Sequence, residues 1–180
     1  MVDYSKKDKI IIIDFGSQVT KLIARRIREL KVYSEILTIK ELYSFKDYSS
    51  VKGIILSGGP STVNKKGFPN IPKFIFELKI PILGICYGLQ LITKNFGGTV
   101  KENTKKREFG RALLKEKNKS LLTKKFFNKK NNFVWMSHQD SVSKIPNEFK
   151  KIASTKYSSL TIIENIKKKI YGIQFHPEVT

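Results

Sequence analysis

The first half of the chain alternates between short apolar runs and segments whose apolar residues recur at helical spacing. Continuous apolar runs predict strands at residues 9–14, 34–39, 53–56 and 80–85. Apolar residues three or four apart predict helices at 19–30, 72–78 and 88–96. Strands that are apolar throughout are typical of a parallel sheet covered on both faces. The pattern therefore predicts an α/β domain with a mostly parallel central sheet flanked by helices.

The second half of the chain shows a different pattern of short runs. Brief strands are predicted near residues 98–101, 133–137, 151–154, 160–164 and 170–175. Strands this close together in sequence suit hairpins, so we expect antiparallel additions to the sheet in the C-terminal half. Active sites on such sheets lie outside the carboxyl ends of the strands.

One cysteine stands where a predicted strand meets a predicted helix. Cys86 lies in Gly84-Ile85-Cys86-Tyr87-Gly88, a cysteine analogue of the G-x-S-x-G nucleophile elbow. Glycines on both sides permit a strained turn that lifts the side chain clear of the sheet. The helix N-terminus behind it favours a thiolate, which is the nucleophilic form. A lone cysteine is more often a small buried hydrophobe, but this context favours a nucleophile.

A cysteine nucleophile needs a base, and the chain has two histidines. His176 lies at the end of a strand-like segment, and Glu178 follows two residues later. Alternate side chains of a strand share a face, so the carboxylate of Glu178 could hold the imidazole in one tautomer while it faces Cys86. His138 is the alternative base, but it lacks the His-x-Glu arrangement of His176 and Glu178. We therefore predict a Cys86, His176 and Glu178 triad.

The net charge of +20 invites a nucleic-acid interpretation. The excess is nearly all lysine scattered along the chain, as codon bias in an AT-rich genome produces, so nucleic acid is not the expected partner. Phe126 and Phe127 beside Lys124, Lys125, Lys129 and Lys130 could stack on RNA, but we expect the two rings to cover the edge of the core.

The cysteine content and the absence of targeting or membrane-spanning patterns indicate the cellular compartment. A single cysteine excludes an internal disulfide and suits a reducing cytosol. The first residues show no signal-peptide pattern, and no apolar run approaches membrane-spanning length. We expect a cytoplasmic protein that does not bind membranes.

Six motifs in register resemble the class I glutamine amidotransferases, and among them the amidotransferase domain of GMP synthases. The motifs are Asp14-Phe15-Gly16-Ser17-Gln18, Ile55-Leu56-Ser57-Gly58-Gly59-Pro60, Gly84-Ile85-Cys86-Tyr87-Gly88-Leu89-Gln90, Arg107-Glu108-Phe109-Gly110, Trp135-Met136-Ser137-His138 and Gln174-Phe175-His176-Pro177-Glu178-Val179-Thr180. The tyrosine after the cysteine and the fourth and fifth motifs favour the GMP synthase branch. The resemblance implies a flavodoxin-like sheet.

The resemblance also implies a reaction and a pocket. Cys86 would attack the side-chain amide of glutamine, giving a glutamyl thioester, ammonia and finally glutamate. The backbone N–H groups of Gly59 and Tyr87 would form the oxyanion hole. Glutamine would be bound by Gly58, Gln90, Ser137 and His138. This chain has Gln139 where the family usually has glycine, which leaves the shape of that loop open.

The resemblance further implies a partner. Residues 1–180 read as one amidotransferase domain, and we expect it to lack the C-terminal helix that the family normally carries. The chain has no pyrophosphatase loop, so a fused or separate synthetase would use its ammonia to convert XMP to GMP. ATP and Mg²⁺ are expected only in that partner, with no cofactor in this domain.

Two other functions are compatible with parts of the sequence. A cysteine peptidase on a similar sheet would share the elbow, but Gln90, the Gly-Gly-Pro loop and His-Pro-Glu favour a glutamine pocket. A basic binding module with a vestigial site would explain the charge, but the complete triad argues against it.

Overall fold

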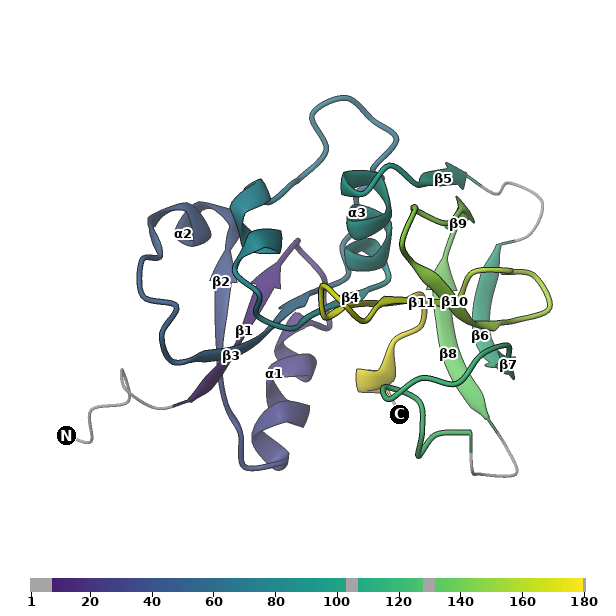
Figure 1. Cartoon of the computed structure of the whole chain (residues 1–180), viewed down its shortest axis with the longest axis horizontal. Coiled ribbons are helices and arrows are strands. Elements are labelled where there is room, and N and C mark those ends of the chain that lie inside the picture. Colours follow the sequence, from purple (N-terminus) through teal and green to yellow (C-terminus); the bar gives the residue numbers. More distant parts are fainter. Residues whose placement is uncertain (1–7, 103–106, 128–131, 180) are drawn as a thin grey trace.

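The computed structural model describes residues 8–102, 107–127 and 132–179. Its centre is an eight-stranded sheet in the order β2-β1-β3-β4-β12-β11-β10-β7 (Figure 1). The first five strands in that order are parallel, and the last three add antiparallel hairpins. The parallel strands are β2 (Tyr33–Thr38), β1 (Lys9–Asp14), β3 (Val51–Leu56), β4 (Ile82–Ile85) and β12 (Ile170–Ile173), and the others are β11 (Ile162–Asn165), β10 (Lys150–Ser154) and β7 (Lys115–Glu116).

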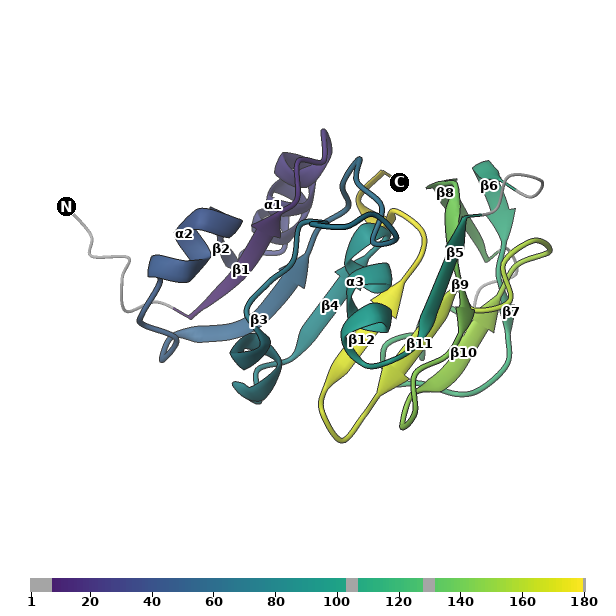
Figure 2. The ribbon, with the colours of Figure 1, turned by 90° about the horizontal axis from the view of Figure 1, so that it is seen from above.

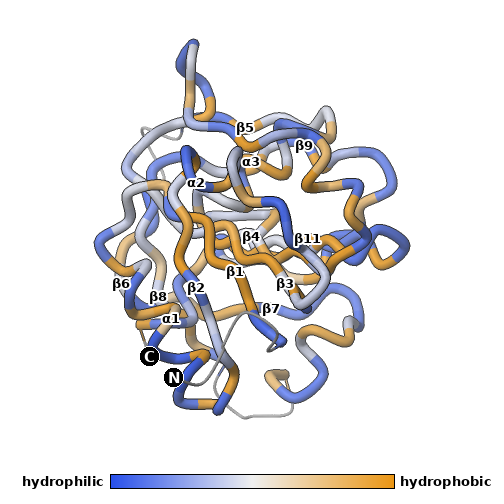
Figure 3. The backbone as a smooth tube through the Cα atoms, turned by 90° about the vertical axis from the view of Figure 1, so that its left-hand side faces the viewer, coloured by the Kyte–Doolittle hydropathy of each residue, from blue (hydrophilic) through white to orange (hydrophobic). Residues whose placement is uncertain are grey.

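Helices cover both faces of this sheet. The side chains of β1 alternate between two buried clusters: Ile11 packs with α2 (Ile39–Ser44) and α3 (Tyr87–Asn95), whereas Ile12 packs with α1 (Thr20–Glu29). Figure 1 shows α2 and α3 on one side of the strands and α1 on the other. The predicted α/β architecture is thus confirmed. Figure 3 shows the central strands as the most hydrophobic part of the chain.

Two ribbons stand beside the antiparallel end of the sheet (Figure 2). One pairs β5 (Thr99–Glu102) with β9 (Asp140–Lys144), and the other pairs β6 (Glu108–Leu113) with β8 (Phe133–His138). Phe126 and Phe127 pack against the cluster beneath α1, as the sequence predicts. Lys129 and Lys130, the other members of the suspected basic patch, lie outside the described residues. None of the helices described here has the length and apolarity of a transmembrane span.

Several predicted boundaries differ from the structure. The helix predicted at 72–78 is the five-residue 3₁₀ helix η1 (Lys73–Glu77), which is confined between Pro72 and Lys79, a residue at φ +57°. Helix α2 is missing from the prediction because six residues are too few to show periodicity, although Thr38 and Glu41 form its capping box. Strands β6, β7 and β9 are also missing, because each is short or mostly exposed.

The crossing of β3, β4 and α3 depends on glycine. A Cβ atom at Gly84 would lie 2.5 Å from the backbone of Gly88, and one at Gly88 would lie 2.3 Å from the carbonyl oxygen of Leu56. Both distances are shorter than any side chain tolerates, and the neighbouring atoms are backbone, which cannot move aside. The two glycines of the elbow therefore let the helix approach the strands.

Gly88→Ala should consequently destabilise the protein by at least about 1–3 kcal/mol, the usual cost of forcing extra atoms into a packed region. Gly53→Ala is the matched control, because its Cβ would meet only the end of the flexible Ile10 side chain, at 2.9 Å. Urea unfolding of the parent and both variants measures the difference. Equal losses of unfolding free energy in the two variants would contradict this account.

Candidate active site

Cys86 occupies the sharp turn between β4 and α3. Its backbone has φ +52° and ψ −101°, a conformation that residues with a side chain rarely adopt. The turn is held from both sides: the N–H of Cys86 donates to the carbonyl of Ile173 at 2.8 Å, and its carbonyl accepts from the N–H of Gln90 at 3.2 Å. The predicted nucleophile elbow is therefore present, and it stands at the N-terminus of α3.

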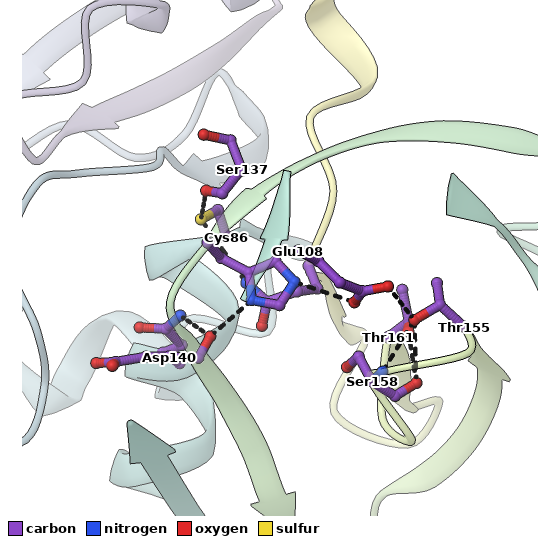
Figure 4. A network of polar contacts seen from close by, with 10 residues as sticks. Cys86, Glu108, Ser137, Asp140, Thr155, Ser158 and Thr161 are labelled. Atoms are coloured by element: carbon purple, nitrogen blue, oxygen red, sulfur yellow. Dashed lines mark hydrogen bonds and ion pairs between the residues drawn. The ribbon is translucent and has the colours of Figure 1, made fainter. Parts of the chain in front are cut away.

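The sulfur of Cys86 lies among polar groups although the residue is only 7% exposed. The side-chain amide of Gln174 approaches Sγ at 3.7 Å, and the carbonyl oxygen of Ser137 lies 3.8 Å from it (Figure 4). Cys86 also lines two cavities, of about 460 and 510 Å³. The sulfur is thus enclosed by the fold and still open to a small substrate.

His176 and Glu178 form the contact that the sequence predicts, but by a different geometry. Nδ1 of His176 lies 2.8 Å from Oε1 of Glu178. Strand alternation does not produce this contact, contrary to the prediction, because β12 ends at Ile173 and residues 177–179 form the 3₁₀ helix η2 (Pro177–Val179). The tight turn of η2, begun by Pro177, folds the carboxylate of Glu178 back onto the ring. A further bond, from the N–H of His176 to the carbonyl of Trp135 at 3.0 Å, fixes the position of this segment.

The ring of His176 is poised to carry a proton. Burial by itself lowers the pKa of His176, but hydrogen bonds to Cys86 and Glu178 and the charges of both groups outweigh it and raise the pKa to about 10. Because a free histidine titrates near pH 6.5, the protonated ring stabilises the folded state fully below that pH. This contribution is lost as the pH rises through about 10.

The loop after β3 closes over the triad on the other side. The hydroxyl of Ser57 accepts from the N–H of Phe15 at 3.1 Å and donates to the carbonyl of Gly58 at 2.8 Å. A Cβ at Gly58 would lie 3.1 Å from Cε1 of His176, so only glycine leaves room for the ring there. Gly59 lines both cavities beside Cys86, and Tyr87 lines the smaller one. The two predicted oxyanion-hole residues thus flank the cysteine.

The cavity of about 460 Å³ is lined by three of the four residues predicted to bind substrate, and Gly58 is the one that does not line it. Gln90, Ser137 and His138 line it together with Cys86. Gln90 lies one helical turn beyond the cysteine, and its Nε2 donates to the carbonyl of Asp140 at 3.1 Å. Gln139 also lines the cavity and its φ lies outside the left-handed region. A side chain at the usual glycine position is therefore accommodated without backbone strain.

Glu108 and Asp140 belong to a polar network (Figure 4) that holds the ring of His138 away from the role of base. Its Nδ1 lies 3.0 Å from the carbonyl of Asp140, and its Nε2 lies 3.4 Å from Oε2 of Glu108. Glu108 stands directly opposite His138 in the β6/β8 ladder, is 6% exposed, and accepts from the hydroxyl of Thr155 at 2.7 Å. Both ring nitrogens of His138 thus face groups other than Cys86.

The sequence predicts no role for three residues of the site, which are Glu108, Asp140 and Gln174. Glu108 and Gln174 lie inside motifs quoted above without an individual role, and Asp140 lies two residues beyond the motif that ends at His138. The backbone carbonyl of Asp140 contacts the side chains of Gln90 and His138, and its carboxylate contacts the hydroxyl of Thr62. Spacing along the chain carries no signal of the contacts with Gln90 and Thr62, since both join distant segments. Within the described residues no three His, Cys, Asp or Glu side chains are grouped as metal ligands would be.

The fold and the site define an α/β enzyme with a cysteine at a strand-to-helix turn, and comparison places it in a family. The model of the family "Glutamine amidotransferase class-I" matches residues 11–180. The chain therefore belongs to the class I glutamine amidotransferases.

Relatives connect the chain to one branch of that family. It is 52% identical over 172 residues to a glutamine-hydrolysing GMP synthase of Brachyspira hyodysenteriae, covering 96% of this chain and 33% of the relative. It is 49% identical to the enzyme of that name from Borrelia garinii, covering 95% of this chain and 32% of the relative. The chain thus spans about a third of the length of these curated relatives.

Solved structures of similar proteins agree with this family assignment. A Thermoplasma acidophilum protein assigned as a GMP synthase component superposes with a TM-score of 0.76 at 30% identity, covering 94% of this chain and 84% of that one. A glutamine amidotransferase of Thermotoga maritima gives a TM-score of 0.74 at 21% identity, covering 94% and 76% of the two chains. The second likeness shows the fold alone.

The protonation of His176 can be tested by NMR. The parent should show a His176 titration near pH 10, and Cys86→Ala and Glu178→Gln should each lower the pKa, because each removes a group that favours the charged ring. With two histidines in the chain, a His138→Asn variant assigns the resonances. A midpoint near 6.5 in the parent would contradict the proposed pairing.

Glu108 should matter for the pocket and not for the nucleophile. Loss of its negative charge beside buried His138 should weaken the binding of a glutamine analogue in the pocket by roughly 1–3 kcal/mol. Glu108→Gln should therefore slow alkylation of Cys86 by a diazoketone analogue of glutamine about tenfold, while alkylation by iodoacetamide changes less than about twofold. Glu116→Gln, a carboxylate paired with Lys119 at the surface, serves as control. Equal slowing of both reagents by Glu108→Gln would show damage to the nucleophile instead.

Proposed function

We propose that this chain hydrolyses glutamine to glutamate and ammonia through Cys86, His176 and Glu178. The sulfur of Cys86 attacks the carbon of the side-chain amide and forms a tetrahedral intermediate. Its collapse breaks the carbon–nitrogen bond as protonated His176 delivers a proton to the departing ammonia. Water then attacks the resulting thioester, with the neutral imidazole accepting its proton, and glutamate leaves as the thiolate is regenerated.

The observation that carries this proposal is the pairing of His176 with both other members of the triad. Nδ1 of its ring lies 2.8 Å from Oε1 of Glu178, and the ring lines the cavity of about 510 Å³ together with Cys86, whose charge contributes to raising the pKa of His176. The carboxylate thereby fixes the orientation of the ring and favours its charged form. A protonated ring beside the sulfur supports a thiolate that is ready to attack and an acid that is ready to protonate the leaving group.

The remaining site residues have roles in binding and charge stabilisation. The backbone N–H groups of Gly59 and Tyr87 would donate to the oxyanion of the intermediate, and one such donor is typically worth about 3–4 kcal/mol. Gly58 and Gln90 would line the substrate's side chain. Ser137 and His138 would contact its amino-acid end, chiefly through backbone atoms. No cofactor is required for these steps.

The ammonia would be used in making GMP. The relatives at about 50% identity are named glutamine-hydrolysing GMP synthases, and this chain matches a third of their length. We therefore infer that a synthetase, fused or separate, accepts the ammonia and aminates XMP, and that ATP and Mg²⁺ bind to that partner. The protein would then act in purine nucleotide biosynthesis, and we expect it to do so in the cytoplasm.

Ammonia release from glutamine is the direct test. The parent should release ammonia, and Cys86→Ala should abolish the release while the thermal unfolding of the variant stays cooperative. His176→Asn should lower the rate by at least about a hundredfold, because it removes the proton donor. His138→Asn should affect KM more than kcat, because His138 lines the pocket without facing the sulfur. Ammonia release that persists in Cys86→Ala would refute the mechanism.

A further inference from the structure

The β6/β8 ribbon turns an apolar face toward solvent. Phe109, Leu113, Phe133 and Trp135 are 62%, 44%, 40% and 43% exposed. They lie on one face, because Phe133 pairs with Leu113 and the other two occupy alternate positions of the same strands. The opposite face is also apolar and contributes Val134 and Met136 to the core. An antiparallel ribbon normally presents polar side chains on its outer face, so the exposed apolar face of this ribbon requires an explanation.

We propose that this ribbon face is the docking surface for another protein domain, one that presents an apolar patch bordered by carboxylates. This inference rests on the proposed function, in which the domain is the synthetase that receives the ammonia. Exposed aromatic residues beside arginine are the typical anchors of protein interfaces. Exposed apolar patches of this kind on a single chain mark sites of association.

The charges around the face indicate the chemistry of the partner. Beside β6 a cleft of about 400 Å³ is lined by the cations Arg107, Arg111, Lys115 and Lys156 and by half-exposed Tyr157. The guanidinium of Arg111 stands over the ring of Phe133, 4.6 Å from its centre. Among the described residues that line this cleft, the one carboxylate is Glu108, which is buried and faces His138. A border of cations is complementary to a partner with acidic residues.

Two other occupants fit less well. A second copy of the chain would bring the same cationic border against itself and would add a second charge of +20. A single-stranded nucleic acid stacks its bases on successive open aromatic rings, but Arg111 stands over the ring of Phe133 and Leu113 is aliphatic, which leaves only Phe109 and Trp135 for stacking. The face therefore favours a protein partner of opposite charge.

The ribbon is joined to the triad through the backbone of β8. The carbonyl of Ser137 lies 3.8 Å from the sulfur of Cys86, and the carbonyl of Trp135 accepts the N–H of His176 at 3.0 Å. Trp135 also lines the cavity of about 510 Å³ with Cys86 and His176, and Phe109 lines the cavity of about 460 Å³. A domain seated on this face would adjoin both openings to Cys86. By moving β8, such a domain could also change the alignment of Cys86 with His176, because the backbone of that strand contacts both residues.

A chimera tests the proposal. In it this chain replaces the matched residues of the Brachyspira hyodysenteriae GMP synthase, so that the synthetase part of that enzyme is present in cis. GMP formation is measured with glutamine and, separately, with ammonium chloride. Leu113→Glu and Arg111→Glu alter the ribbon face. Ile166→Glu and Lys167→Glu, at exposed positions in the turn between β11 and β12, are the matched controls.

We expect both ribbon variants to lower glutamine-dependent GMP formation by at least about tenfold, the loss typical of an interface anchor. Ammonium-dependent formation should stay within about twofold, and the controls should change neither rate. In the isolated chain, alkylation of Cys86 by iodoacetamide should be the same in Leu113→Glu and the parent, which separates docking from damage to the site.

Ribbon variants that behave like the controls would overturn the docking surface while leaving the proposed function intact. A parent chimera that makes GMP from ammonium but releases no ammonia from glutamine would instead refute the proposed function, and the inference with it. Sedimentation showing a dimer that Leu113→Glu dissociates would assign the face to a second copy. Binding of polyuridylate that is lost in Leu113→Glu would assign it to RNA.

Discussion

The close approach of α3 to β3 and β4 is the constraint on which the rest of the site depends. Gly84 and Gly88 remove the side chains that would keep the helix away, and the chain must then turn within one residue to pass from strand to helix. That residue is Cys86, held at φ +52° by hydrogen bonds to Ile173 and Gln90. The strained backbone is maintained because buried packing on both sides leaves no alternative. The sulfur is thereby presented at the carboxyl edge of the sheet.

Strand β8 provides the second support, and it does so through its backbone. Its carbonyl groups approach the sulfur of Cys86 and bind the N–H of His176, while its side chains point alternately into the core and out to solvent. The last residue of the strand, His138, is held by Glu108 from the paired strand. One short ribbon thus connects the nucleophile, the base, the substrate pocket and the exposed apolar face.

The sequence predicted the parallel half of the fold well and the antiparallel half only in outline. The apolar runs that became β1, β3 and β4 are buried on both faces, so their pattern is unambiguous. Strands β6 and β9 are half-exposed, and their pairing joins residues 20 to 45 positions apart, which local patterns do not record. His176 and Glu178 illustrate both a prediction that the structure confirms and one that it contradicts. Their contact was predicted, but a 3₁₀ turn brings them together instead of strand alternation.

By itself the sequence determined the family and predicted the elbow and the triad of Cys86, His176 and Glu178, because glycine spacing and short motifs record local geometry and chemistry. Tertiary structure alone decided which histidine faces the sulfur, how Glu108, Asp140 and Gln174 complete the site, and that the outer face of the β6/β8 ribbon is apolar and lies beside it. These features depend on contacts between segments far apart in the chain. Such contacts follow from the packing of the whole sheet, and no neighbouring residues encode them.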